Sequence, residues 1–330
     1  MKTKFIILAL AALAVSACYK DYVGDYSRTA CGFANQTDVR SLIVGEGMTF
    51  STGIALGGTI SNDEDRLISF GVDYSLVSDD TYNQLKGHTF SYIAALMKAV
   101  PSISALPASL YELETESGIP GKALIRKGTH LGVITVKVDS AAFLADAGRL
   151  YPKQVIPLVI TDGNGTDIIS GKEYTAIGVR YENMLFGNWY HGGYAEVRDA
   201  SGNIVRTDTY HTAIPQADNK IWTLTTSAPF ELTANAVGSE FNGAAAQMKL
   251  TLGADDSITI SAVAGARYEV KPDGESRFVR SKLLQDRKII LNYQYVSGTE
   301  TIHAHDTLTF RNRLRDGVNE WQDEKQSHYE

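Results

Sequence analysis

The chain has 330 residues, of which 44% are hydrophobic and 21% are charged, and its formal net charge at pH 7 is −7. A mildly acidic chain lacks the basic surface that nucleic-acid binding requires, so we expect no nucleic-acid partner. The two cysteines, Cys18 and Cys31, are too few for a disulfide scaffold. The length suits two domains of ordinary size.

The first 17 residues are typical of a bacterial export signal. Two lysines precede an apolar run from Phe5 to Val15, which is shorter than the roughly 20 residues that span a bilayer as a helix. The run ends in "VSAC", which resembles the lipobox of bacterial lipoproteins. That resemblance implies cleavage before Cys18 and lipidation of its thiol. The alternative is an ordinary signal peptide with a chance cysteine after it.

Lipidation at Cys18 would place the protein on the outer membrane. Several acyl chains on one residue anchor a protein stably, and the acidic start at Asp21 and Asp25 resembles the surface-export signal of Bacteroidetes lipoproteins. We therefore expect a lipid-anchored protein that faces the cell exterior, with residues 18–36 as a tether. Removing residues 1–17 would change the formal charge to −9. Cys31 would then have no second cysteine with which to form a disulfide. We expect it to be a buried small apolar residue or a free thiol near the terminus.

Residues 37–182 have the pattern of an all-strand domain that contains one short helix. Alternating apolar residues predict strands in "RLISFGVD" (66–73), "HLGVITVKVD" (130–139) and "YTAIGVRY" (174–181). The run "VIPLVI" at 155–160 is apolar on both faces, as expected of a strand in the middle of a sandwich. In "TFSYIAALMKAV" at 89–100, the apolar residues recur at helical spacing until Pro101.

A second unit is predicted over residues 183–330, with the boundary near "YENMLFGNWYHGG" at 181–193. Strand patterns separated by turn sequences occur in "MKLTL" (248–252), "SITISAV" (257–263), "KIILNYQYV" (288–296) and "ETIHAHDTLTFRNR" (300–313). Short strands joined by tight turns favour an antiparallel meander, and closure into a barrel removes its exposed edges. The charged tail predicts a short terminal helix or coil, and Trp321 within it is interpreted as a clamp on the barrel rather than as a binding subsite.

Two long segments resemble known modules. The first half, through "IVGEGMTFSTGIALGGTISNDEDRLISFGVDYSLV" (43–77), "LPASLYEL" (106–113) and "YPKQVIPLVITDGNGTDIISGKEYTAIGVRYEN" (151–183), is similar to a domain of Bacteroidetes surface lipoproteins known as domain of unknown function 1735. The second half, from "FGNWYHGG" through "DTLTFRNRLRDGVNEWQDE", resembles domain of unknown function 4361. The resemblance implies an immunoglobulin-like β-sandwich followed by a lipocalin-like β-barrel, with a departure at the helical segment 89–100.

The same resemblance implies membership of a glycan-utilisation locus. Lipoproteins of this kind capture polysaccharide or host glycan beside an outer-membrane transporter or hydrolase of the same locus. The family carries no established catalytic residues, and no catalytic or cofactor-binding motif occurs in the sequence. We therefore expect a protein that is not an enzyme and takes no cofactor, although unlinked carboxylates leave glycoside hydrolysis open.

Two patterns have metal-like spacing. The loop from Asp162 to Glu173 places oxygen ligands as a calcium loop does, but Asp167 stands where the sharp turn needs glycine, so a hairpin turn is favoured. His303 and His305 lie on one face of a strand at metal-ligand spacing. That face also carries several threonines, so we interpret it as the polar face and expect no metal there.

The aromatic residues of the second half are the better candidates for ligand binding. Flat rings suit sugars, because the apolar face of a pyranose packs on them, and Trp and Tyr also provide a polar group. The candidates are Trp189, Tyr190, Tyr194 and Trp222. The alternative for Trp189 and Trp222 is core packing.

The sequence therefore predicts a non-catalytic glycan-binding protein. Two other functions remain open at this stage. One is an assembly module that docks on a partner protein of the locus, and the other is a barrel that binds a small apolar ligand, as lipocalins do.

Overall fold

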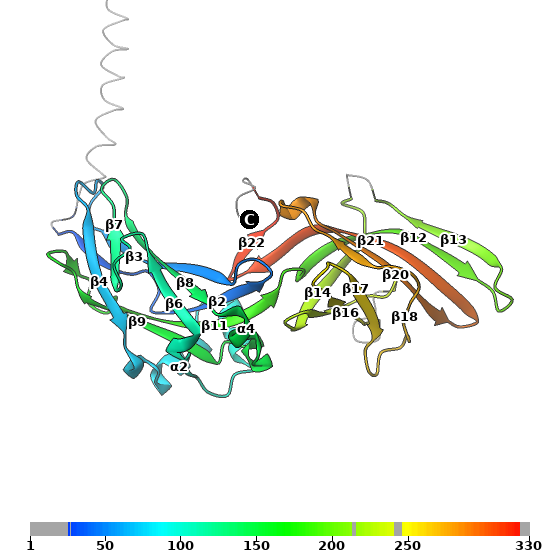
Figure 1. The fold of residues 1–330 in the computed structure, drawn as a ribbon, viewed down its shortest axis with the longest axis horizontal. Helices are drawn as coiled ribbons and strands as arrows, with labels where there is room; N and C mark the ends of the chain where they lie inside the picture. Colours follow the sequence, from blue (N-terminus) through cyan, green and yellow to red (C-terminus); the bar gives the residue numbers. More distant parts are fainter. Residues whose placement is uncertain (1–25, 27, 213–215, 241–245, 324–330) are drawn as a thin grey trace, which may run out of the picture.

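The computed structural model describes residues 26, 28–212, 216–240 and 246–323. The fold is mostly β, as predicted: two facing sheets form the first half, and a strongly curled sheet forms the second (Figure 1). The expected signal peptide and Cys18 lie outside the described residues. None of the helices in the described part has the length and apolarity that crossing a bilayer requires.

The first half is a sandwich of two sheets. One sheet has the strand order β10-β1-β3-β8-β6, with bounds Asp167–Ile168, Ala30–Phe33, Thr49–Gly57, Leu131–Val138 and Tyr111–Thr115. The other has the order β2-β11-β9-β4-β7, with bounds Thr37–Val44, Tyr174–Asn183, Gln154–Asp162, Arg66–Val72 and Lys122–Ile125, and β5 (Ser104–Ala105) pairs with β9. Alternate residues point into the core between the sheets, and Ile134, Val136 and Val138 of β8 are buried as predicted.

Helices cover the outer face of the second sheet. Helix α3 (Ser91–Met97) lies in the segment where the sequence predicts a helix, and α2 (Asp79–Lys86) precedes it. Leu85, Ile93 and Met97 pack against Val155 of β9 in a separate small core. The run 155–160 is therefore apolar on both faces because helices cover one side of its sheet.

Several short helices were not predicted. They are α2, α4 (Ser140–Leu144) and the 3-10 turns η1 (Tyr74–Leu76), η2 (Ala108–Leu110), η3 (Ala147–Leu150) and η5 (Leu284–Asp286). Helix α2 nevertheless has a recognisable start, because the Ser78 hydroxyl accepts a hydrogen bond from the amide of Thr81 and Asp79 follows in the first turn.

The tether predicted over residues 18–36 is wrong at its C-terminal end. Strand β1 lies within this segment and pairs with β3 inside the sandwich. Cys31 and Phe33 are buried there, so the strand is held by its apolar side chains. Cys31 is a free thiol whose pKa is raised by burial.

The second half is one antiparallel sheet with the order β17-β16-β15-β14-β12-β21-β20-β18, to which β13, β19 and β22 add at the sides. The first strands are β12 (Gly187–Arg198), β13 (Ile204–Tyr210), β14 (Ile221–Ala228), β15 (Glu231–Ala234), β16 (Met248–Leu252) and β17 (Ile258–Ala262). The later ones are β18 (Lys271–Pro272), β19 (Arg277–Val279), β20 (Lys288–Ser297), β21 (Glu300–Arg315) and β22 (Val318–Glu320). The turn sequences "DASGN" (199–203) and "GADD" (253–256) lie between β12 and β13 and between β16 and β17.

The sheet curls until its ends meet. The amide of Ile258 at the start of β17 donates to the carbonyl of Ser276, and the amide of Phe278 in β19 donates to the carbonyl of Asp256, both at 2.8 Å. These bonds join β17, at one end of the strand order, to β19, at the other end, and close one side of a barrel. The inward residues of β20, predicted from their alternation, are all buried: Ile289, Leu291, Tyr293 and Tyr295.

The described part of the tail, up to residue 323, contains a hairpin in place of the expected helix or coil. Strand β22 pairs back on the last residues of β21. Trp321, which directly follows, is 56% exposed, so the prediction that it packs against the barrel is wrong.

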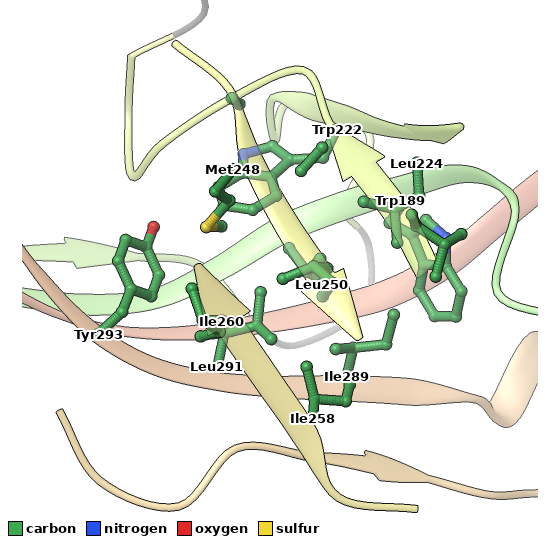
Figure 2. Close-up of a cluster of buried hydrophobic side chains, with 14 of the residues drawn as sticks. Trp189, Trp222, Leu224, Met248, Leu250, Ile258, Ile260, Ile289, Leu291 and Tyr293 are labelled. Atoms are coloured by element: carbon green, nitrogen blue, oxygen red, sulfur yellow. The ribbon is translucent and has the colours of Figure 1, made fainter. Parts of the chain in front are cut away.

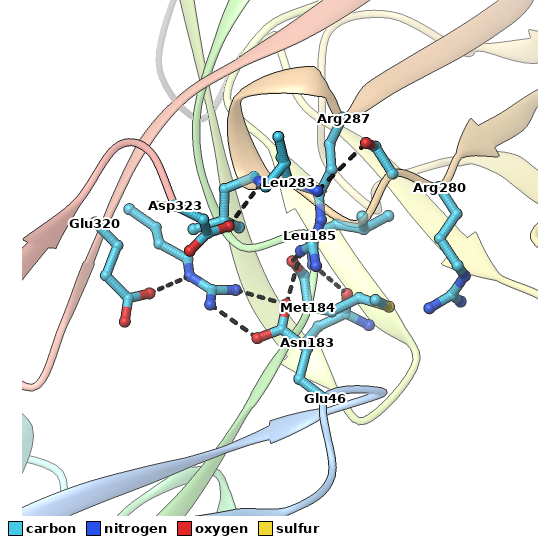
Figure 3. A network of polar contacts seen from close by, with 12 residues as sticks. Glu46, Asn183, Met184, Leu185, Arg280, Leu283, Arg287, Glu320 and Asp323 are labelled. Carbon is cyan, nitrogen blue, oxygen red and sulfur yellow. Dashed lines mark hydrogen bonds and ion pairs between the residues drawn. The ribbon is translucent and has the colours of Figure 1, made fainter. Parts of the chain in front are cut away.

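The sandwich and the barrel meet through a buried cluster of charges. Glu46, in the turn between β2 and β3, bonds Arg313 of β21 and Arg287, which directly precedes β20 (Figure 3). Arg313 also bonds Glu320 of β22. Glu320 also pairs with the partly exposed Arg315 at 3.5 Å, so three guanidinium groups meet two carboxylates at the junction.

Candidate functional site

A shallow depression of about 550 Å³ lies on the outer face of the barrel sheet, the face turned away from its core. Tyr194 of β12 stands at its centre and pairs in register with Thr209 of β13 on one side and His305 of β21 on the other. His305 in turn pairs with Asn292 of β20. Because residues in register share a face, these four side chains form one row across four strands.

Tyr194 is presented to solvent on a fixed support. Its ring is stacked on the imidazole of His305, with 4.6 Å between the ring centroids and 27° between the planes. The Nδ1 atom of His305 lies 2.8 Å from the Asn292 side-chain oxygen, which holds the imidazole in place. Tyr194 remains 42% exposed. The arrangement offers an aromatic ring beside hydroxyl and amide groups.

A buried polar network lies beneath this row, on the inner face of the same strands. The carboxylate of Asp306 lies 2.8 Å from Nε2 of His191 and accepts a 2.6 Å hydrogen bond from the hydroxyl of Tyr293. The amide of Gly238 donates to the same hydroxyl. Burial, together with the charge of Asp306, raises the pKa of Tyr293, so this residue keeps its proton. The network ties β12, β20 and β21 together under the depression.

The sequence analysis missed this network. Asp306 occupies an inward position of β21 between the buried residues Ala304 and Leu308. A single acidic residue among alternating apolar residues was the signal in the sequence that could have indicated the network. Its partners, however, lie on other strands, and the sequence of one strand does not specify how it pairs with the others.

The two predicted tryptophans are not at the surface. Trp189 and Trp222 face each other in register on β12 and β14, and both are fully buried in the barrel core (Figure 2). Trp189 donates from Nε1 to the carbonyl of Leu185 and meets Phe310 edge-on, whereas Trp222 stacks on His191. Their proposed stacking role does not fit the structure, because a small barrel needs large side chains to fill its interior.

The two predicted tyrosines do lie on the outer face, both on β12. The guanidinium of Arg311 lies 5.8 Å from the ring centroid of Tyr190, which is half-buried. Four residues of strand separate Tyr190 from Tyr194, or about 13 Å at 3.3 Å per residue. The depression includes Tyr194 but not Tyr190.

His303 and His305 share the polar outer face, as predicted. Each has a separate partner, since Nδ1 of His303 lies 2.6 Å from the carboxylate of Asp273 whereas His305 contacts Asn292. Within the described ranges, no three His, Cys, Asp or Glu side chains gather as a metal site would require.

The loop from Asp162 to Glu173 joins the antiparallel neighbours β9 and β11, as the predicted hairpin does, and the amide of Ile160 donates to the carbonyl of Glu173 at 2.7 Å across its base. The Asp162 carboxylate accepts the amide of Asn164, which closes a tight turn. The next strand, β10, pairs with β1 in the other sheet of the sandwich, so the turn carries the chain from one sheet to the other.

Comparison with known proteins gives no family model and no curated protein that matches the chain. Solved structures do match. A protein of unknown function from Bacteroides ovatus aligns with a TM-score of 0.59 at 19% identity, over 91% of this chain and 98% of the other. This likeness shows that the two proteins share a fold.

Two further Bacteroides structures align more loosely. A multidomain protein from Bacteroides ovatus that includes domain of unknown function 1735 has a TM-score of 0.41 at 14% identity, over 88% of this chain and 99% of the other. An auxiliary nutrient binding protein from Bacteroides thetaiotaomicron has a TM-score of 0.40 at 16% identity, over 87% and 96%.

Proposed function

We propose that the protein binds glycan without catalysis, on the outer face of its barrel. The observation that carries this proposal is the row Thr209–Tyr194–His305–Asn292, in which a fixed and exposed aromatic ring lies between hydroxyl and amide groups. The apolar face of a pyranose would pack against Tyr194, and the neighbouring polar side chains would hydrogen-bond its hydroxyl groups.

The chemistry of the lining favours binding over hydrolysis. Glycoside hydrolysis uses two carboxyl groups that flank the scissile bond. Among the described residues that line the depression, the acidic one, Asp306, turns its carboxylate into the barrel and is fully buried. The depression therefore offers recognition groups rather than an acid and base pair.

The cellular setting belongs to the same proposal. A lipid on Cys18 would hold the protein on the outer membrane, facing outward, where it would pass glycan to a transporter or hydrolase of the same polysaccharide-utilisation locus. Support comes from the export-signal pattern of residues 1–17 and from the looser structural likeness to a nutrient binding protein. Palmitate labelling of the wild-type chain and of Cys18→Ala tests the anchor directly.

The two alternative functions have less support. A lipocalin-like ligand needs an open interior, whereas Trp189, Trp222 and Leu250 fill the middle of this barrel (Figure 2). An assembly role remains the second candidate. It is favoured by the exposed edge strand β13, where Ile204 and Val205 are about half exposed.

The test is a screen of the purified chain on a glycan array and on affinity gels that contain plant or host polysaccharides. Tyr194→Ala is compared with Tyr151→Ala, a matched control because Tyr151 is 41% exposed and lies in the sandwich. Circular dichroism confirms that both variants fold. Loss of retention in Tyr194→Ala alone supports the proposal. No retention of the wild-type chain on any glycan would overturn it in favour of the assembly role.

A further inference from the structure

Trp321 differs from the other two tryptophans of the chain. Trp189 and Trp222 are fully buried, whereas Trp321 is 56% exposed just after β22. A solvent-exposed indole offers a flat apolar surface that a ligand can cover, together with a polar N–H group.

The residues on both sides of Trp321 are held by hydrogen bonds. Before it, the carboxylate of Glu320 accepts a 2.5 Å bond from Nε of Arg313. After it, the carboxylate of Asp323 accepts the amide of Leu284 at 2.8 Å, and the amide of Asp323 donates to the side chain of Gln285 at 3.0 Å (Figure 3). The exposed ring is therefore mounted on a short segment with two fixed ends, which lowers the entropy lost when a ligand binds.

A depression of about 410 Å³ adjoins the ring at the junction of the sandwich and the barrel. Thr49 of β3 lines it from the sandwich, and Arg315, Asn319 and Gln322 line it from the C-terminal segment. Glu46, Glu320 and Asp323 line it too, and their carboxylates are engaged by Arg287, Arg313 and the amide of Leu284. Ligand sites occur preferentially at such junctions, as apolar surfaces with a few convergent polar groups. Here the indole supplies the apolar surface, and amide, hydroxyl, guanidinium and carboxylate groups surround it.

We propose that Trp321 is the platform of a second saccharide site. The apolar face of one sugar ring packs on the indole, and its hydroxyl groups bond the side chains of Asn319, Gln322 and Arg315. This site is separate from the row around Tyr194. It uses a different ring and a different depression, and it includes a residue of the sandwich.

The two sites are joined by one strand. His305 and Arg315 are ten residues apart on β21, which is about 33 Å at 3.3 Å per residue. If the proposed function at Tyr194 holds, on which this step rests, one long polysaccharide can occupy both sites. Once the glycan is bound at one site, its binding to the second site is intramolecular. The affinity for the glycan therefore rises with its length once it is long enough to reach both sites.

Tryptophan fluorescence tests the Trp321 site, because the other two indoles are buried. The purified chain is titrated with cello-, xylo-, manno- and malto-oligosaccharides and with galactose-terminated mucin glycans, while quenching by acrylamide is measured. We expect at least one of these saccharides to protect the exposed fluorescence and to change its emission. The effect should disappear in Trp321→Leu and persist in Tyr194→Ala.

Two results would overturn the inference. One is acrylamide quenching that no saccharide alters at saturating concentration. The other is a saccharide effect that survives in Trp321→Leu, because the signal would then come from a buried indole. If the proposed Tyr194 site does not bind glycan, neither of these results follows. The Tyr194→Ala chain retains Trp321 and is measured in parallel, so the two sites are tested separately.

Discussion

Glu46 and Arg313 lie 267 residues apart in the sequence and form a two-pronged ion pair with bonds of 3.0 and 2.8 Å. Both side chains are almost completely buried. Glu46 belongs to the turn between β2 and β3 of the sandwich, and Arg313 belongs to β21 of the barrel, so this pair joins the two halves. Arg287 adds a second guanidinium at 2.7 Å from the same carboxylate (Figure 3).

Glu46→Gln should destabilise the chain strongly. It removes the carboxylate that Arg287 and Arg313 share, while Arg313 keeps its bond to Glu320, and removal of one partner from a buried pair costs about 3–5 kcal/mol. Chemical denaturation measures the change in the free energy of unfolding. The control is Glu114→Gln, which removes an exposed pair with Lys137 and should cost less than about 1 kcal/mol. Equal losses in the two variants would show that the buried cluster does not stabilise the junction.

The Glu46 cluster also predicts the direction of pH dependence. Burial pushes the pKa of Glu46 upward, but Arg313 and Arg287 outweigh it and hold this pKa below the usual value of 4.5. The stabilisation is therefore fully present above about pH 4.5. It is lost as the pH falls through the lowered pKa of the folded state.

Denaturation curves for wild type and Glu46→Gln at several pH values check this sign. The difference in their free energies of unfolding should be constant from neutral pH down to about 5 and should shrink in stronger acid. A difference that grows on acidification would contradict the assignment.

Trp222→Ala should unfold far more easily than Trp321→Ala. The first substitution removes a fully buried ring that stacks on His191, and such core truncations cost about 3–5 kcal/mol. The second removes an exposed ring and should stay within about 0.5 kcal/mol. Thermal or chemical denaturation measures both variants. Similar stabilities would mean that Trp222 is not a core residue.

Gly193→Ala should disturb the Tyr194 row from within. Gly193 has a φ of 110°, and a β-carbon placed there would lie 2.1 Å from the carbonyl oxygen of His305. Strands β12 and β21 must then separate next to Tyr194, so we expect lower stability and weaker glycan binding. Gly202→Ala is a matched control, because its φ is also positive but nothing lies within 4 Å. It should cost about 1–2 kcal/mol of backbone strain and leave binding intact.

The features that depend on local alternation could be predicted from the sequence. The inward faces of β8 and β20 follow from a period of two, and the helix at α3 follows from apolar spacing before Pro101. Strand β1 escaped prediction because only four residues of a polar segment enter the sheet. Its pairing with β3 is a tertiary contact, which the local sequence does not specify.

The candidate site could be predicted only in part. The polar face of β21 and the presence of an exposed aromatic residue on β12 were within reach of the sequence. Which ring is exposed follows from the period of two, because Trp189 shares its phase with the buried Ala195 and Val197 whereas Tyr190 and Tyr194 take the other phase. The row of Thr209, Tyr194, His305 and Asn292 depends on the register of four strands, which a single sequence does not specify.

The most direct test of the central claim is the affinity of the purified chain for the glycan that the array selects, measured by calorimetry for wild type, Tyr194→Phe and Tyr194→Ala. We predict that Tyr194→Phe binds nearly as well as wild type, because the ring is kept. Tyr194→Ala should bind at least about tenfold more weakly, a loss of about 1.4 kcal/mol. Equal affinities for all three chains would contradict glycan recognition at this ring.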